Sequence, residues 1–204
     1  MIAAALSIAA LLAGPSQVSA NVTNPWFPLR PGTVLRYRGT DEGVPVKDVL
    51  SVTRKTRSVR GGRARVVHDR VFKHGHVVED TLDWYAQDAA GNVWYFGEAT
   101  KELDSRGRVT SREGSWQDGV AGARAGIFMP AHPRVGRAYR QEYYKGHAED
   151  HFKIESIRGN MMVTHEWTPI EPGVLDQKVY KRGVGTTSED SLRGGSEHLH
   201  LVSP

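Results

Sequence analysis

The sequence predicts an all-β protein, a single antiparallel meander of about ten strands that curls into a calycin-like barrel or a strongly bent sheet. Helix signals are nearly absent after residue 20, and short strand-like runs recur between turns of Gly, Pro, Asn and Asp. A length of 204 residues suits a single domain with its own core. Closure of the sheet is expected because a meander of many short strands must protect its edges.

The first expected element is a leader and not a strand. Residues 1–20 carry no charge, and the apolar run from Ile2 to Ala13 is shorter than the roughly 20 residues that a membrane span needs. Val18-Ser19-Ala20 supplies small residues of the kind that precede a signal-peptidase cut. We therefore predict a signal peptide over 1–20, one β-barrel-like domain over 21–204, and a secreted or periplasmic location. An uncleaved N-terminal helix is the alternative.

The strands are expected where apolar residues alternate or gather between turns. The predicted segments are 33–39, 46–53, 64–72, 77–86, 93–98, a hairpin over 101–112, 137–144, 149–157, 161–169, 176–183 and 197–202. Residues 114–136 break the rhythm because they are rich in Gly, Ala and Pro. We expect them to form a long loop that covers the mouth of the barrel, with Trp116 and Phe128 as an apolar lid.

Cysteine content and charge exclude several classes of function. The chain has no Cys, so disulfides, a thiolate nucleophile and a Cys-ligated metal are excluded. The net charge is +4, and a basic run lies between Arg54 and Arg65. The run lacks interleaved aromatic residues, and we therefore expect no nucleic acid partner. It is predicted to be a solvated hairpin tip, with weak contact to an anionic cell-envelope surface as the alternative.

The predicted strand at 77–86 carries an unusual amount of negative charge. Residues two apart in a strand share a face, so Glu79, Asp83 and Tyr85 line one polar side. That side faces either solvent or a wet, acidic barrel interior.

The segment 137–144 supplies side chains that match this acidic face. Its alternation places Arg140, Glu142 and Tyr144 together, with Glu149 following further on. Buried charges persist by pairing or by binding a ligand, and Lys178 is a candidate cation for the same interior. Carboxylates that are crowded in this way have raised pKa values and can serve as acid and base.

The favoured function is the binding of a small ligand in a polar, acidic pocket under the 114–136 loop. The predicted ligand-binding residues are Glu79, Asp83, Tyr85, Trp116, Phe128, Arg140, Glu142, Glu149 and Lys178. The first alternative is a secreted enzyme (a hydrolase, lyase or cyclase-type isomerase) that uses carboxylate acid/base chemistry in this pocket. Its candidate catalytic residues are Asp83 or Glu142 as base and Tyr85, Tyr144 or Lys178 as acid. The second alternative is a structural envelope protein whose polar face is only solvated.

Spaced histidines raise the question of a metal. His147, Glu149 and His151 lie two apart and form the candidate site for a divalent ion, because imidazole and carboxylate are suitable ligands. Histidines on the protein surface are the alternative explanation. No cofactor is predicted, and the sequence does not indicate an oligomeric state.

Four segments carry a resemblance to known proteins: VEDTLDWYAQDAAGNVWYFGEATKE, GSWQDGV, IFMPAHPRVGRAYRQEYYKGHAED and EWTPIEPGVLDQKVYKRGVG. Together they look like a family of exported bacterial β-proteins of unknown function. Its motifs here are EDTLDWYAQDxxGNVWYFGE and YRQEYYxGxAED, and the likeness covers most of the predicted mature chain. The resemblance implies an exported β-architecture and carries over no catalytic residue.

Overall fold

The computed structural model describes residues 14–203, and over this range it contains strands and turns but no helix. This confirms the all-β prediction. No helix able to cross a membrane is found within the described range. Between residues 14 and 203 the strands number 17, more than the predicted ten or so. They are β1 (Val18–Ser19), β2 (Val34–Asp41), β3 (Val44–Val59), β4 (Gly62–Lys73), β5 (His76–Asp88), β6 (Val93–Ala99), β7 (Glu102–Leu103), β8 (Val109–Ser111), β9 (Trp116–Gln117), β10 (Arg124–Met129), β11 (Ala138–Arg140), β12 (Glu142–Tyr143), β13 (His151–Arg158), β14 (Met161–Trp167), β15 (Leu175–Lys181), β16 (Gly185–Arg193) and β17 (His198–Ser203).

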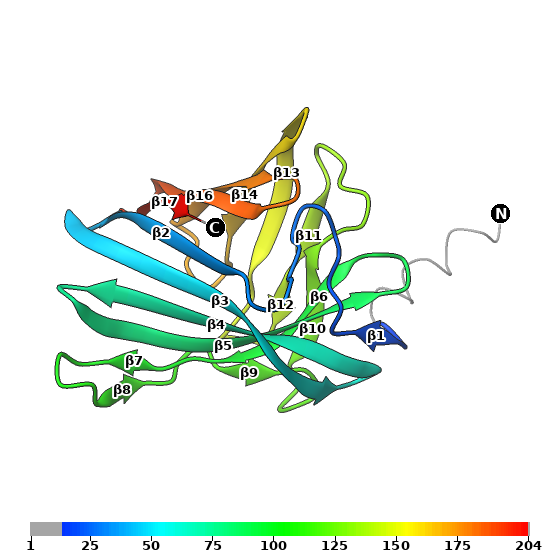
Figure 1. Cartoon of the computed structure of the whole chain (residues 1–204), viewed down its shortest axis with the longest axis horizontal. Helices are drawn as coiled ribbons and strands as arrows, with labels where there is room; N and C mark the ends of the chain where they lie inside the picture. The colour runs from blue at the N-terminus through cyan, green and yellow to red at the C-terminus, as the bar shows by residue number, and fades with distance from the viewer. Residues whose placement is uncertain (1–13, 204) are drawn as a thin grey trace.

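The main strands follow one another around a nearly closed, barrel-like sheet (Figure 1). β2 to β6 pair as consecutive antiparallel neighbours, and β6 then pairs with β10. On the other side of β2, the sheet continues through β17, β16, β15, β14 and β13. The ring nearly closes because β12 pairs with β10 and β11 pairs with β13. The calycin-like part of the prediction stays a prediction.

The seam of the sheet lies where β11 passes into β12. The sequence predicts one continuous strand over 137–144, but the structure divides it at Gln141, whose backbone N–H donates to the carbonyl of Asp150 (2.8 Å). Gly126 of β10 packs directly on this break, because a Cβ at that position would lie 2.2 Å from the carbonyl oxygen of Arg140. The strand alternation therefore changes between Arg140 and Glu142.

An apolar segment closes one part of the interior. Residues 22–29 precede β2, and within them Trp26 and Phe27 are buried against the inner core. The carbonyl of Pro25 accepts a hydrogen bond from the Gly183 N–H (2.7 Å), which ties this segment to the turn between β15 and β16. The Pro-rich entry thus forms a plug, which we define as residues 22–29.

The basic run at 54–65 is a hairpin tip, as predicted, but most of its cations are engaged within the molecule. The guanidinium of Arg57 lies over the Trp84 ring, 3.7 Å from its centroid. Arg60 forms an ion pair with Asp118 (2.6 Å). These contacts join the hairpin tip to the outer apolar cluster around Trp84, and the contact with an envelope surface stays a prediction.

The predicted 114–136 loop is wrong as a lid. The segment contains β9 and β10, and β10 pairs with β6 from Gly126 to Met129. Its small residues obscured a short strand whose alternating positions pack on both faces of the sheet. Trp116 is buried in the inner core and Phe128 packs against it, so neither side chain covers a mouth.

The predicted leader overlaps the described fold. Residues 1–13 lie outside the described range, but Val18 and Ser19 form β1, which pairs with β5. Val18 is buried in the outer apolar cluster. Cleavage after Ala20 would remove this strand from the sheet, and the signal peptide stays a prediction.

Candidate functional site

A pocket of about 360 Å³ is lined by an excess of carboxyl groups, and we call it the acidic pocket. Its seven carboxyl side chains belong to Glu98, Glu142, Asp150, Glu166, Glu171, Asp176 and Glu189. Lys178 and His147 are the basic side chains in the same wall. The connection between β14 and β15, residues 168–174, borders the opening, whereas the predicted covering loop contributes only Gly114.

A smaller chamber of about 130 Å³ extends the interior toward the plug. Phe27 of the plug lines it together with Asp48, Asp69 and Tyr85. Lys178 and Glu189 line both the smaller chamber and the acidic pocket, so the two cavities meet at these side chains.

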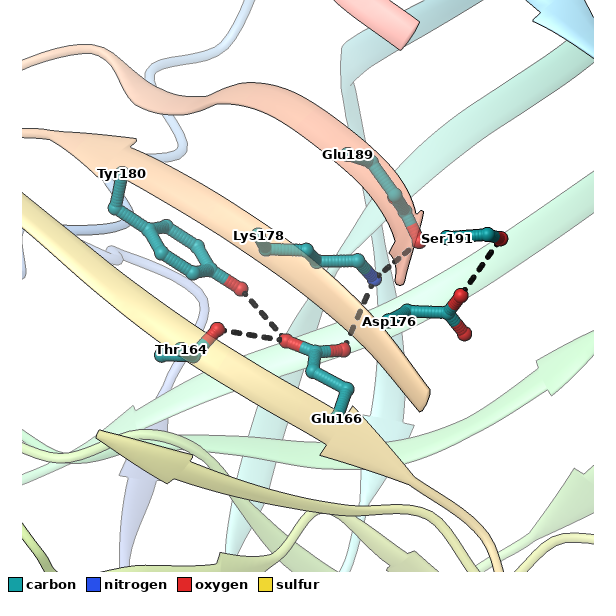
Figure 2. A network of polar contacts seen from close by, with 7 residues as sticks. All are labelled: Thr164, Glu166, Asp176, Lys178, Tyr180, Glu189 and Ser191. Carbon is teal, nitrogen blue, oxygen red and sulfur yellow. Dashed lines mark hydrogen bonds and ion pairs between the residues drawn. The ribbon is translucent and has the colours of Figure 1, made fainter. Parts of the chain in front are cut away.

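Lys178 is the centre of the polar network in Figure 2. Its ammonium Nζ lies 3.1 Å from Glu166 Oε2 on β14 and 3.2 Å from Glu189 Oε1 on β16. The strand register explains this geometry, because Lys178 is the direct cross-strand neighbour of both Thr164 and Glu189. Burial alone lowers the pKa of Lys178, but the Glu166 and Glu189 charges outweigh it, and the net pKa is raised. The group therefore stays an ammonium.

The other oxygen of Glu166 is also fixed by hydrogen bonds. The hydroxyls of Thr164 (3.2 Å) and Tyr180 (3.4 Å) both donate to Glu166 Oε1, as Figure 2 shows. Ser191 donates to Asp176 Oδ1 (2.8 Å) at the edge of the same group. This part of the wall is consequently preorganised around one cation.

Several wall carboxyls resist ionisation. Burial, reinforced by the neighbouring Asp83 and Glu142 charges, raises the pKa of Glu98 to about 10. Burial and the Asp150 charge raise the pKa of Glu142 to about 8, although the Trp116 indole N–H opposes the shift. Burial also raises the pKa of Glu189 to about 7, against the attraction of Lys178. The pocket wall thus retains protons near neutral pH.

Two aromatic donors hold the deepest carboxylates. Tyr95 donates its hydroxyl to Asp83 Oδ1 (2.6 Å), and Trp116 donates its indole N–H to Glu142 Oε2 (2.5 Å). Burial and the Asp69 charge raise the pKa of Asp83 to about 7, despite the Tyr95 hydrogen bond. Tyr85 stacks on Tyr95 with ring centroids 4.7 Å apart, so aromatic rings pack beside these carboxyl groups.

Asp48 and Asp69 form a second carboxyl pair in the smaller chamber. Burial and the adjacent Asp69 raise the pKa of Asp48 to about 10. The Oδ1 atom of each residue has no hydrogen-bond partner within the described part of the chain. A proton held by Asp48 relieves the repulsion between the two groups.

The structure places four of the predicted site residues in the cavity walls: Tyr85, Phe128, Glu142 and Lys178. Trp116 and Asp83 line neither cavity, but Trp116 is hydrogen-bonded to Glu142 and Asp83 to Tyr95. The structure does not bring in the other three predicted wall residues. Glu149 accepts the Gly146 N–H (2.8 Å) in an exposed turn. Arg140 lies over the Tyr143 ring (4.6 Å) outside the acidic pocket. Glu79 is partly buried and accepts the Thr81 hydroxyl, but it lines neither cavity.

The remaining chemical candidates also lie apart. Tyr144 stacks on His147 at the pocket rim (4.5 Å). His147 contacts Glu113 (2.7 Å), whereas His151 stacks on Trp167, so the predicted metal ligands do not converge. Within the described residues, no group of three or more His, Asp or Glu side chains is arranged to hold a metal ion.

Sequence reasoning missed eight carboxyls that line the cavities: Asp48, Asp69, Glu98, Asp150, Glu166, Glu171, Asp176 and Glu189. Gly97 has a φ of 132° beside an irregular β5–β6 register, and this irregularity moves Glu98 off the alternation that predicts its face. The pattern Met162, Thr164, Glu166 does indicate one face of a strand. Whether this face carries a buried ion pair depends on how the strand pairs with β15, and the sequence pattern does not reveal that pairing.

Comparisons with known proteins leave the family open. No family model and no curated protein matches the chain. Among solved structures, the fold is similar to a protein of Bacteroides fragilis described as a candidate exported protein with a YmcC-like fold. The identity is 14%, the match covers 86% of this chain and 96% of the other, and the TM-score is 0.45. A likeness at this level assigns no function.

Proposed function

We propose that the protein binds a small ligand in the acidic pocket around Lys178. One observation carries this proposal: carboxyl groups from five strands converge on an open cavity of about 360 Å³. An interior with only a structural role is packed with apolar side chains at high density. A cavity of this size, with a few fixed polar groups, falls within the range of small-molecule sites.

The charge balance favours a cationic ligand that donates hydrogen bonds, such as an alkylamine or an amino sugar. The wall offers seven carboxyls against the ammonium of Lys178 and the imidazole of His147. Glu166 and Glu189 are already engaged by Lys178, whereas Glu98 and Glu142 remain protonated because of burial and mutual repulsion. An entering ammonium lets these groups ionise, and binding is then coupled to proton release.

A second candidate function is acid/base catalysis in the same pocket. Glu142 favours it, since burial raises its pKa to about 8, near the working pH of a general acid or base. The Trp116 hydrogen bond fixes its orientation. Replacement of Glu142 by Gln separates the two functions. An enzyme keeps ligand binding and loses turnover, whereas a binding protein changes affinity and shows no turnover before or after substitution.

The proposed site of action is outside the cytoplasm, after removal of residues 1–20. The charge-free N-terminal run and the small residues before Asn21 support this proposal. Intact-mass measurement of the protein recovered from its own cells tests it. A mature chain beginning at Asn21 is expected, and recovery of the full chain from the cytoplasm contradicts it.

Native mass spectrometry of that same material tests ligand binding directly. An added mass of a few hundred daltons, lost on denaturation, is expected for a small ligand. The Lys178→Met and Glu142→Gln variants are expected to reduce the bound fraction, with Lys181→Met as the exposed control on the same strand. Absence of any bound species, together with no response to spermidine or glucosamine in titration calorimetry, contradicts the proposal.

A further inference from the structure

A second pocket, of about 430 Å³, lies at the seam of the sheet, and we call it the outer pocket. Apolar contact surface is supplied by Trp94, Ile127 and Tyr139. Its basic side chains are Arg137, Arg140 and His151. It shares no lining residue with the acidic pocket, and the proposed function does not use it.

The seam explains why the surface is hollow there. β10 joins β12 through Arg124 and Ala125, whereas β11 pairs with β13 on the other side. No ladder pairing joins residues 126–129 to β11 within the described strands. Gly126 allows the two backbones to touch at one point, and the strands separate beyond it. The hollow is therefore a consequence of the strand geometry.

The charge in the outer pocket is opposite to that in the acidic pocket. Its lining contains two guanidinium groups and one imidazole but no carboxylate. The guanidinium of Arg140 lies over the Tyr143 ring, 4.6 Å from its centroid. Because this contact already restricts the Arg140 side chain, the side chain loses less conformational entropy when it binds a ligand. His151 Nδ1 lies 2.8 Å from the Glu149 carbonyl, an arrangement in which Nδ1–H donates and Nε2 is left for another partner.

The apolar part of the pocket belongs to a continuous cluster. Ile127 and Trp94 are both largely buried in the outer apolar cluster, and Tyr139 packs against that cluster from β11. The Trp94 indole N–H is already satisfied by Asp88 Oδ2 (2.8 Å). The exposed remainder of this surface can therefore receive an apolar group without leaving the indole donor unpaired.

We propose that the outer pocket binds a small single-chain amphipathic anion. Its carboxylate contacts Arg137 and Arg140, and its hydrocarbon body lies against Trp94, Ile127 and Tyr139. Guanidinium groups bind carboxylates through charge-assisted, often bidentate hydrogen bonds. The juxtaposition of these cations with an apolar wall selects an amphiphile over either a simple salt or a neutral hydrocarbon.

The test uses decanoate as the probe and titration calorimetry as the measurement. Binding of decanoate to the wild-type protein is expected, with at least roughly tenfold weaker binding of decanol, because guanidinium groups bind a carboxylate through charge-assisted hydrogen bonds. Acetate serves as the headgroup-only control. Equal binding of decanoate and decanol overturns the proposal, as does absence of decanoate binding.

Variants locate the binding. The Arg137→Ala/Arg140→Ala double variant is expected to weaken decanoate binding by roughly tenfold or more. Arg134→Ala is the matched control, because this exposed residue in the same connection does not line the pocket. Circular dichroism establishes that each variant is folded, and Ala138→Trp supplies a second, space-filling variant that is expected to block binding. Retained affinity in both the double variant and Ala138→Trp overturns the proposal.

Discussion

Lys178 on β15 and Glu189 on β16 are direct cross-strand neighbours, and their charged groups lie 3.2 Å apart where the two interior cavities meet. The same ammonium lies 3.1 Å from Glu166 on the opposite neighbouring strand. One cation thus links three strands and offsets part of the negative charge of both cavities. The stability and the binding properties of the interior both depend on this arrangement.

Replacement of Lys178 by Met is expected to lower the free energy of unfolding by about 3 kcal/mol, because it leaves two buried carboxylates without their cation. This value is at the low end of the range for a broken buried ion pair, since the Lys178 side chain is 21% exposed. Urea unfolding measures the change. Lys181→Met is the control, and an equal effect of the two substitutions contradicts the central role of Lys178.

Stability is expected to fall as the pH rises from about 5 to about 8. Asp83 and Glu142 have pKa values raised to about 7 and about 8, so the folded state keeps protons that the unfolded state has already lost in this window. Thermal unfolding is expected to show a melting temperature lower by roughly 5 °C at the higher pH. Glu142→Gln is expected to flatten this dependence, and exposed Glu42→Gln is not. A melting temperature that rises over the window contradicts the protonated interior.

Glu98→Gln is expected to preserve or increase stability near pH 8. The raised pKa of Glu98, about 10, means that the native group is a neutral acid there, and an amide of the same shape imitates it. At pH 8 the unfolded wild-type chain is stabilised because Glu98 ionises there, and the Gln variant removes this stabilisation of the unfolded state. Chemical unfolding at pH 8 is the measurement. A loss above about 1 kcal/mol indicates that Glu98 is instead needed as a carboxylate.

The affinity for an amine is expected to increase between about pH 6 and about pH 8. Within this range the wall groups Glu142 and Glu189 become easier to ionise, as their raised pKa values of about 8 and about 7 require. Titration of spermidine in two buffers of different ionisation enthalpy measures both the affinity and the protons released. Affinity that is independent of pH, without proton release, argues against carboxyl recognition.

The alternation of the sequence predicts the fold class and part of the acidic site. Period-two patterning predicts that Asp83 and Tyr85 share one face of β5 but leaves open which side it is, and in the structure this face lies inside. It misplaces Arg140, since the alternation does not continue through the break at Gln141. The face of a strand is a local property, whereas a break depends on which strands pair with it.

The partners of Lys178 illustrate the remaining gap. Glu166 and Glu189 are separated from Lys178 by 12 and 11 positions in the chain, and each meets it only through a specific strand register. A shift of one residue in either register turns the carboxylate to the other face of the sheet. The sequence therefore predicts that charges lie inside, but the structure is needed to identify which of them meet.

The contact between Pro25 and Gly183 has a consequence for the order of assembly. The plug, residues 22–29, is synthesised early, whereas the turn that contacts it at Gly183 is synthesised much later. In the same way, β2 can pair with β17 only after most of the described chain has been made. Such distant contacts are slow to form because long loops must first be closed. Residues 22–29 can therefore take up their place against the core only after the turn at Gly183 and strand β17 have been synthesised.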